Sequence, residues 1–136
     1  MRANWQTCKR RRDLRGRWVA LYVTMNPRGE ISMSRLTYEK LGEPAAVQLL
    51  FDSVNNRIGL KPSHREAREA FPVGKRGSHG GRRIHAYTLM QEFRIDLPST
   101  IQFYDADIDD DGVLILDLRT ARVPSRVLNH PQASRL

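Results

Sequence analysis

Residues 29–42 read Gly-Glu-Ile-Ser-Met-Ser-Arg-Leu-Thr-Tyr-Glu-Lys-Leu-Gly. Ile31 and Met33 alternate with polar residues, and such alternation is typical of a half-buried strand. Ser34 is a residue type that caps helix N-termini, and Gly42 is the type that ends helices. The stretch therefore predicts a short strand that runs directly into a short amphipathic helix.

The same plan occurs a second time. A shift of 54 positions aligns the region from Gly29 to Pro62 with the region from Arg83 to Leu118. The aligned pairs share apolar character, capping chemistry or an identical residue: Ser34 with Thr88, Leu36 with Met90, Leu41 with Ile95, Pro44 with Pro98, Val47 with Ile101, and Gln48 with Gln102. A unit of this size cannot bury its own apolar face. We therefore predict a mainly β protein with short helices, in which two internal repeats pack on each other around one core.

In each copy, the helix is followed by a proline and by two further β-prone runs. We expect one hairpin over residues 47–51 and 57–61, and a second over residues 100–104 and 113–118. Between the copies, residues 63–69 open with the spacing of a capping box and predict a short helix.

The predicted core takes the apolar stripe of both helices and the strands that follow them. Its members are Leu36, Leu41, Val47, Leu49, Met90, Phe93, Ile95, Ile101 and Phe103. Three further aromatic residues stand at periodic apolar positions, and we assign them to the core rather than to a base-stacking surface: Tyr22, Tyr38 and Phe51.

Length and composition indicate one domain of ordinary size. The chain has 136 residues, of which 40% are hydrophobic, and a single cysteine, Cys8. One cysteine excludes a disulfide framework and a CxxC metal site, which fits a reducing cytoplasm. No apolar run approaches the ~20 residues that span a bilayer, so we expect no membrane segment.

We divide the chain into five segments: a basic tail (1–17), repeat 1 (18–62), a connector (63–70), repeat 2 (71–120) and a C-terminal tail (121–136). The net charge of +8 is spread unevenly over them. Residues 1–17 carry seven basic groups and one acid, whereas residues 84–120 carry two basic groups and eight acids. A polyanion would therefore meet the tail and the centre of the chain and be repelled by the second hairpin.

The central basic segment reads Lys-Arg-Gly-Ser-His-Gly-Gly-Arg-Arg over residues 75–83, and we expect a flexible loop from Gly74 to Arg83. Guanidinium groups match phosphate geometry, and glycines let a backbone approach closely. This loop supplies four candidate nucleic-acid contacts: Lys75, Arg76, Arg82 and Arg83. A solvated connector is the alternative.

The N-terminal tail supplies four more candidates: Lys9, Arg10, Arg11 and Arg12. They suit binding along phosphates or in a minor groove. A solubilising tail fits their composition equally well, so both interpretations stay open.

The order of elements resembles the AbrB-like swapped-hairpin domains. Residues 29–42 are similar to the core segment of that family, and Gly81 to Ile95 is a second, weaker match. In single-copy members two chains exchange hairpins to build one barrel that binds DNA, and MraZ-like tandem members carry both copies in one chain. The resemblance covers roughly residues 19–118 and implies a tandem swapped-hairpin barrel.

The resemblance also implies DNA contacts from the first copy. Arg28 and Arg35 stand where the family places basic residues, in the loop before the short helix and within it. Glu30 and Glu39, however, occupy positions where the family often has basic residues. The second copy has the richer basic loop.

The sequence offers no catalytic or metal motif that outweighs a structural explanation. The run Asp107-Ile-Asp-Asp-Asp-Gly112 resembles the first half of a calcium loop, but Leu118 stands where a bidentate glutamate is needed. Asp-Gly is itself a strong hairpin signal. The four histidines have no ligand spacing, so we expect no metal, no cofactor and no enzymatic activity.

Two functions remain. The first is non-enzymatic nucleic-acid binding, with double-stranded DNA as the partner and transcriptional regulation of AbrB-like type as the role. The second is a protein–protein interaction or assembly module on the same fold, with a homo-oligomer or another protein as the partner.

Overall fold

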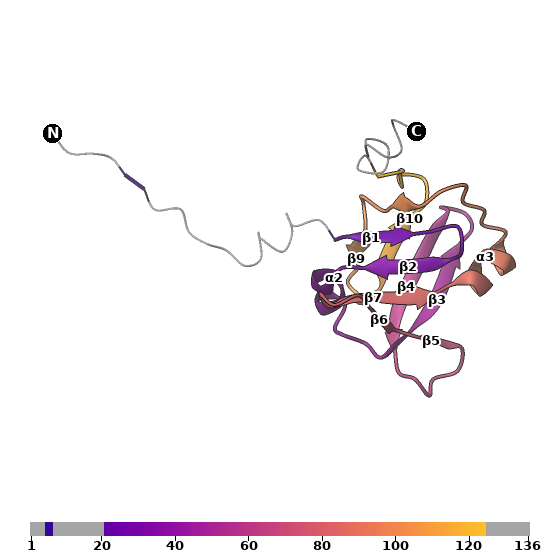
Figure 1. Cartoon of the computed structure of the whole chain (residues 1–136), viewed down its shortest axis with the longest axis horizontal. Coiled ribbons are helices and arrows are strands. Elements are labelled where there is room, and N and C mark those ends of the chain that lie inside the picture. The colour runs from indigo at the N-terminus through magenta and orange to yellow at the C-terminus, as the bar shows by residue number, and fades with distance from the viewer. Residues whose placement is uncertain (1–4, 7–20, 125–136) are drawn as a thin grey trace.

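The computed structural model describes residues 5–6 and 21–124, which form a mainly β molecule with two short helices (Figure 1). The candidates Lys9 to Arg12 and residues 125–136 of the C-terminal tail lie outside the described residues. The elements are β1 (Val23–Met25), β2 (Glu30–Met33), α2 (Arg35–Lys40), β3 (Ala46–Asp52), β4 (Arg57–Ser63), β5 (Ala70–Pro72), β6 (Gly74–Arg76), β7 (Gly81–His85), α3 (Tyr87–Phe93), β8 (Ile101–Gln102), β9 (Asp107–Ile108) and β10 (Leu114–Asp117).

The strands form two antiparallel five-stranded sheets. The first has the order β6-β7-β2-β1-β8, and the second has the order β5-β3-β4-β10-β9. In Figure 1 the strands β1, β2 and β7 lie in front of β3 and β4. Within residues 21–124 no strand pairing closes either sheet, so the closed barrel implied by the resemblance is not found.

Two chain segments contribute to both sheets. Only Val73 separates β5, at the edge of the second sheet, from β6, at the edge of the first. Residues 103–106 separate β8 from β9 in the same way. Both segments link the sheets covalently at their edges.

One apolar cluster fills the space between the sheets. Its fully buried members come from both halves of the chain and include Val23, Met25, Ile31, Val47, Ile58, Leu60, Ile84, Phe103, Leu114 and Leu116. Of the predicted core residues, Leu41, Val47, Met90 and Phe103 are buried, and Leu49, Ile95 and Ile101 pack against the cluster. Phe93 is 38% exposed, so its assignment to the core is wrong. The prediction of one shared core is therefore largely correct.

The helix α2 begins as the sequence predicts but buries a different side chain. The hydroxyl of Ser34 accepts a hydrogen bond from the backbone N–H of Thr37 at 3.2 Å. Thr37 is fully buried, whereas Leu36 is 36% exposed, so the assignment of Leu36 to the core is wrong. The Thr37 hydroxyl hydrogen-bonds to the backbone of Tyr22 and so joins the helix to the residue that precedes β1.

Three other local predictions are wrong. The helix expected over residues 63–69 does not form: Ser63 ends β4, and residues 64–69 form turns, because their mostly exposed side chains find no surface to pack on. The expected loop from Gly74 to Arg83 is a hairpin, β6–β7, whose turn places Gly77 and Gly80 at positive φ. The N-cap of α3 is Ala86 instead of Thr88, and its side chain makes no capping bond.

The hairpin expected over residues 100–104 and 113–118 does not form, because its two strands pair with other strands. β8 pairs with β1, and β10 pairs with β9 and β4. Phe103, directly after β8, is fully buried, and a turn follows in which Ala106 N–H donates to the Phe103 carbonyl at 3.3 Å. This turn separates the expected strand over 100–104 from its partner. None of the described helices has the length and apolar character needed to cross a membrane.

Candidate nucleic-acid interface

A row of polar side chains crosses the outer face of the first sheet. Strand pairing sets Arg83 opposite Ser32, Ser32 opposite Thr24, Thr24 opposite Gln102, and Gln102 opposite Arg122. Directly opposed residues in an antiparallel sheet share a face. The next row along the strands, Met25, Ile31 and Ile84, is fully buried, so the polar row must point outward.

The row is long enough to contact two sides of a DNA groove. From Arg83 to Arg122 it crosses four strand intervals of ~4.8 Å, or about 19 Å. The major groove of B-DNA is ~12 Å wide. Guanidinium groups stand at both ends of the row, with short hydrogen-bonding side chains between them.

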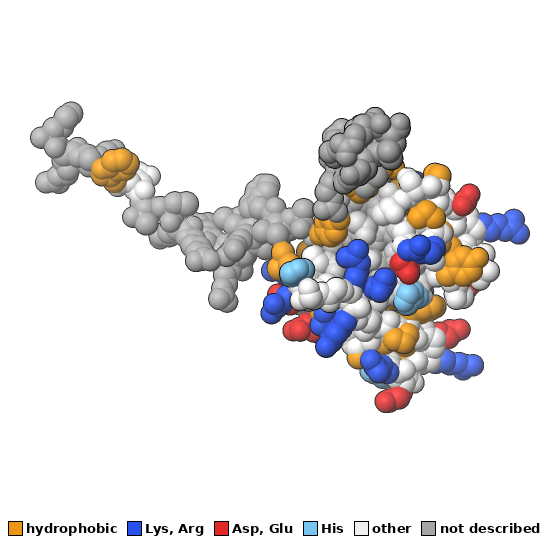
Figure 2. Space-filling model, in the orientation of Figure 1, with side chains coloured by type: hydrophobic (Ala, Val, Ile, Leu, Met, Phe, Trp, Pro, Cys, Tyr) orange, Lys and Arg blue, Asp and Glu red, His pale blue; other side chains and the backbone are white. Residues whose placement is uncertain are grey.

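Arg28, Arg76 and His85 extend this surface. Alternation along β6 and β7 places Arg76 and His85 on the same side as Arg83. Arg28 lies in the turn between β1 and β2, and its ion pair with Glu30 places its guanidinium at the same face. We call the surface formed by Arg28, Arg76, Arg83, His85 and Arg122 the basic face; Figure 2 shows lysine and arginine side chains gathered here, with an acidic side chain among them.

Glu30 is the acidic residue that the strands place on the basic face. Its Oε1 lies 3.2 Å from Nη2 of Arg28 and 3.8 Å from Nη1 of Arg83, and its Oε2 lies 3.8 Å from Nδ1 of His85. Hydrogen bonds from the Asn26 amide and the Arg28 guanidinium lower the pKa of the Glu30 carboxyl. Glu30 is therefore ionised at neutral pH and offsets part of the positive charge.

Arg35 lies at the edge of the basic face, across a cleft from Arg76. Tyr22, directly before β1, lines this cleft of about 270 Å³ together with residues of β2, α2 and the β6–β7 hairpin. The stem of Arg35 rests on the turn, because a Cβ added at Gly80 would lie 2.7 Å from its Cδ. The Nε of Arg35 donates to Oε2 of Glu39 at 2.9 Å.

Lys75 and Arg82, the other two candidates from residues 74–83, lie on the side of the first sheet opposite to the basic face. Lys75 is paired with Arg82, and Arg82 is paired with the buried Met33, so both belong to the inner side of the sheet. The Arg82 guanidinium donates to the carbonyls of Gly80 and Gly81 and lies 4.5 Å from the centre of the Tyr38 ring. Arg82 therefore holds the β6–β7 turn against α2.

Sequence reasoning missed His85 and Arg122 of the basic face and Tyr22 beside it. Arg122 was assigned to the C-terminal tail, yet its backbone N–H and C=O both bond to Gln102, at 3.0 and 2.7 Å. Tyr22 was assigned to the core but is 38% exposed. The alternation that buries Val23 gives a signal for Tyr22, because adjacent strand residues face opposite sides.

In the aspartate-rich turn, the Asp109 side chain accepts hydrogen bonds from the backbone of the same turn. Oδ1 of Asp109 accepts the N–H groups of Asp111 and Val113, each at 2.9 Å. Among the described residues, no three His, Cys, Asp or Glu side chains are grouped in a way that could hold a metal ion. This turn is thus explained by hairpin geometry, with Gly112 at positive φ.

Comparisons with protein-family models, with curated proteins and with solved structures gave no match. The AbrB-like resemblance therefore stays a prediction that rests on residues 29–42 and 81–95.

Proposed function

We propose that this protein is a non-enzymatic nucleic-acid-binding protein that contacts double-stranded DNA through the basic face. The observation that carries the proposal is the pairing of β2 with β7, which brings basic residues of both halves of the chain onto one surface. Arg28 comes from the first half, and Arg76 and Arg83 come from the second. Phosphate contacts would supply most of the affinity.

The proposal includes an AbrB-like regulatory role in the cytoplasm, built on two related halves. Two strand pairings support the relation between the halves. β2 and β7 pair antiparallel with Ile31 opposite Ile84, and β4 and β10 pair antiparallel with Gly59 opposite Ile115. Corresponding strands that meet in this way are expected of two copies related by an approximate two-fold axis.

A titration with a labelled random-sequence duplex at two salt concentrations tests the DNA proposal. We expect binding at low salt that weakens steeply as salt is raised. The double variant Arg76→Gln/Arg83→Gln should bind more weakly and reduce the slope of log K against log salt by about one to two units. Its matched control is Arg65→Gln/Arg68→Gln, which removes two exposed charges from the turns between β4 and β5.

A wild-type chain that shows no affinity for the duplex at low salt would contradict the proposal. Equal losses in the two double variants would also contradict it, because they would indicate a dependence on net charge alone.

A protein-interaction function is the second candidate, favoured by the surface around Phe93. The Phe93 ring packs against the Phe51 ring, tilted by 31° at a centroid distance of 4.8 Å, yet Phe93 is 38% exposed. Two clefts, of about 340 and 330 Å³, meet at this residue. If the surface joins two copies of the chain, sedimentation should show an oligomer that Phe93→Ser dissociates.

A further inference from the structure

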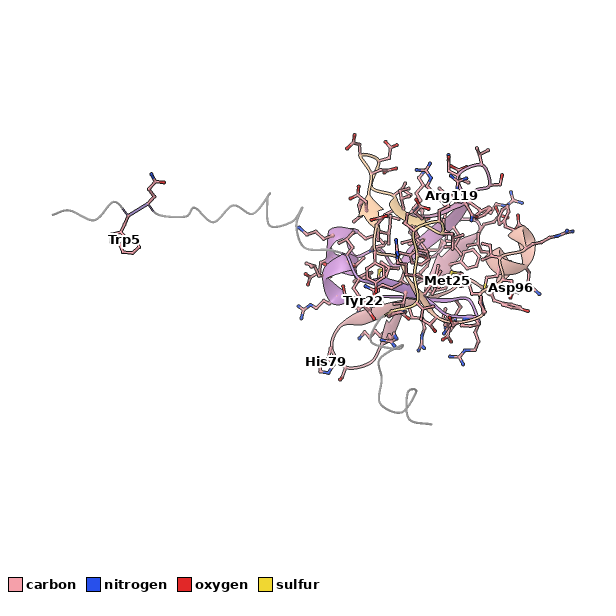
Figure 3. All side chains as sticks on the ribbon, turned by 90° about the horizontal axis from the view of Figure 1, so that it is seen from above. Trp5, Tyr22, Met25, His79, Asp96 and Arg119 are labelled. Carbon is pink, nitrogen blue, oxygen red and sulfur yellow. The ribbon has the colours of Figure 1, made fainter. Side chains whose placement is uncertain are left out.

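The cleft between Arg35 and Arg76 opens at one corner of the basic face. Its lining residues are Tyr22, Ser32, Met33, Ser34, Arg35, Arg76, Gly77, Ser78, His79 and Gly81. Figure 3 shows Tyr22 and His79 on the same side of the molecule, opposite Arg119. At about 270 Å³, the cleft is slightly below the ~300–1,000 Å³ of drug-sized ligand sites. It therefore suits one small group.

Two guanidinium groups give this cleft its preference for an anion. Arg76 has no ion pair within the described part of the chain, and its strand is exposed throughout. Arg35 has one nitrogen bonded to Glu39, and its other donors remain for a ligand. The side chain of Arg35 is 71% exposed, while its stem is held in place by the turn at Gly80.

The Ser34 hydroxyl that caps α2 is already engaged, so it does not create the anion preference. The Ser34 hydroxyl is bonded to both the backbone N–H and the hydroxyl of Thr37. The ligand must therefore be held by side chains from two separate elements, α2 and β6. Ser78 and His79 add further polar groups in the β6–β7 turn.

Tyr22 gives the cleft an aromatic wall. The residue precedes the buried Val23 and so lies on the outer side of the sheet, where it is 38% exposed. An exposed ring beside arginine side chains is the arrangement on which nucleic-acid bases stack. The Tyr38 ring, by contrast, is occupied by the Arg82 guanidinium within the protein.

We propose that this cleft is a subsite for a single nucleotide, whose phosphate lies between Arg35 and Arg76 and whose base stacks on Tyr22. The inference rests on the proposed nucleic-acid function and makes it more specific. The protein then prefers a ligand with an unpaired nucleotide, such as a duplex with a single-stranded end, over a blunt duplex of the same length.

Calorimetric titration of the full chain at low salt with dAMP, deoxyadenosine and inorganic phosphate tests the subsite. We expect dAMP to bind at least tenfold more tightly than either fragment. Arg76→Gln should weaken dAMP binding about tenfold and weaken phosphate binding as well. Tyr22→Leu should weaken dAMP binding about tenfold, in line with the loss of one stacked base, and leave phosphate binding unchanged.

Two controls keep the result interpretable. Tyr22→Trp retains an aromatic ring and should retain dAMP binding, so a loss in Tyr22→Leu with an unchanged melting temperature reports stacking. Glu66→Gln lies outside the cleft, in the exposed turn between β4 and β5, and should leave dAMP binding unchanged. Equal affinities for dAMP and phosphate would overturn the nucleotide subsite, as would the absence of dAMP binding to the wild-type chain.

Blunt duplex binding, measured separately, tests the basic face. A chain that binds the blunt duplex but not dAMP refutes the subsite alone, and a chain that binds dAMP but no duplex refutes the proposed function alone.

Discussion

Glu30 is the single residue with the most influence on the basic face. It contacts Arg28, Arg83 and His85, and its hydrogen bond with Asn26 holds it in place. A phosphate that approaches these cations must compete with the carboxylate. The charge of Glu30 therefore lowers the affinity of the basic face for polyanions.

We predict that Glu30→Gln strengthens duplex binding at low salt and steepens the salt slope by about one unit. The amide keeps the shape of the side chain while it removes the negative charge. Fluorescence anisotropy with a labelled duplex measures both effects. Glu66→Gln, in the exposed turn after β4, makes the same change in net charge away from the face. If it has the same effect, the local explanation fails.

Asp52 controls the turn between β3 and β4. Its carboxylate accepts bonds from Val54 N–H, from the backbone and side chain of Asn55, and from the Arg57 guanidinium. These bonds, chiefly the one from the Asn55 side chain, lower the pKa of Asp52 well below its ordinary value of 3.8. The ionised form is therefore stabilised by folding.

This lowered pKa determines how the contribution of Asp52 to folding stability depends on pH. Its contribution to stability is present above pH 3.8, the unfolded value, and is lost as the pH falls towards the folded pKa. Asp52→Asn should therefore melt at a lower temperature than the wild type at pH 7, and the gap should close as the pH falls below about 3.8. Asp110→Asn, an exposed control, should show no such convergence.

At the scale of elements, the turn before β2 and the start of α3 fit together closely. Gly29 has φ of +84°, and a Cβ there would lie 2.8 Å from both N and Cα of Tyr87. The Ala86 N–H donates to the Gly29 carbonyl at 2.7 Å. This contact joins the first hairpin to the second helix and leaves no room for a side chain.

We predict that Gly29→Ala destabilises the protein more than Gly77→Ala does. Both glycines have positive φ, but a Cβ at Gly77 would meet nothing within 4 Å. Gly77→Ala should cost about 1–2 kcal/mol for the backbone alone. Gly29→Ala should cost a further 1–3 kcal/mol or so from overpacking. Urea denaturation measures the difference, and equal costs would remove the steric argument.

Local chemistry explains which elements the sequence could predict. Ser34 and Gly42 frame α2 correctly, because a hydroxyl cap and a residue with positive φ act within a few positions of the chain. The strands β3 and β4 were predicted from an equally local signal, the β-prone runs over residues 47–51 and 57–61. Residues 63–69 carry an equally good cap signal, but no tertiary surface covers them, so no helix forms.

The candidate site was only partly predictable, because strand register decides it. Arg82 and Arg83 look equivalent in the sequence, yet one packs on Tyr38 and the other faces outward. The contribution of Arg122 depends on its pairing with Gln102, twenty residues earlier, which composition cannot reveal.

At the scale of the whole molecule, one core means one unfolding event. Leu60 and Leu116 come from different halves, and both are fully buried in the same cluster. Leu60→Ala and Leu116→Ala should each cost about 2–5 kcal/mol. Leu50→Ala, at a residue that is 44% exposed, should cost much less.

Calorimetry of the same variants checks the shared core. Each variant should unfold in a single transition with equal calorimetric and van't Hoff enthalpies. Two separate transitions, with each mutation affecting only one of them, would show that the halves fold independently.

The single residue between β5 and β6 also determines where this chain tolerates extra length. Side chains in a strand alternate between faces, so one residue inserted beside Val73 would turn β6 over relative to β5. Arg76 would then exchange its outward position for an inward one. The tips of the turns at residues 65–68 and 109–112 have no such constraint, because they are largely exposed and lie between strands rather than within them. Epitope tags, fluorescent reporters and new chain termini therefore belong at those tips, and the junction at Val73 should stay unchanged.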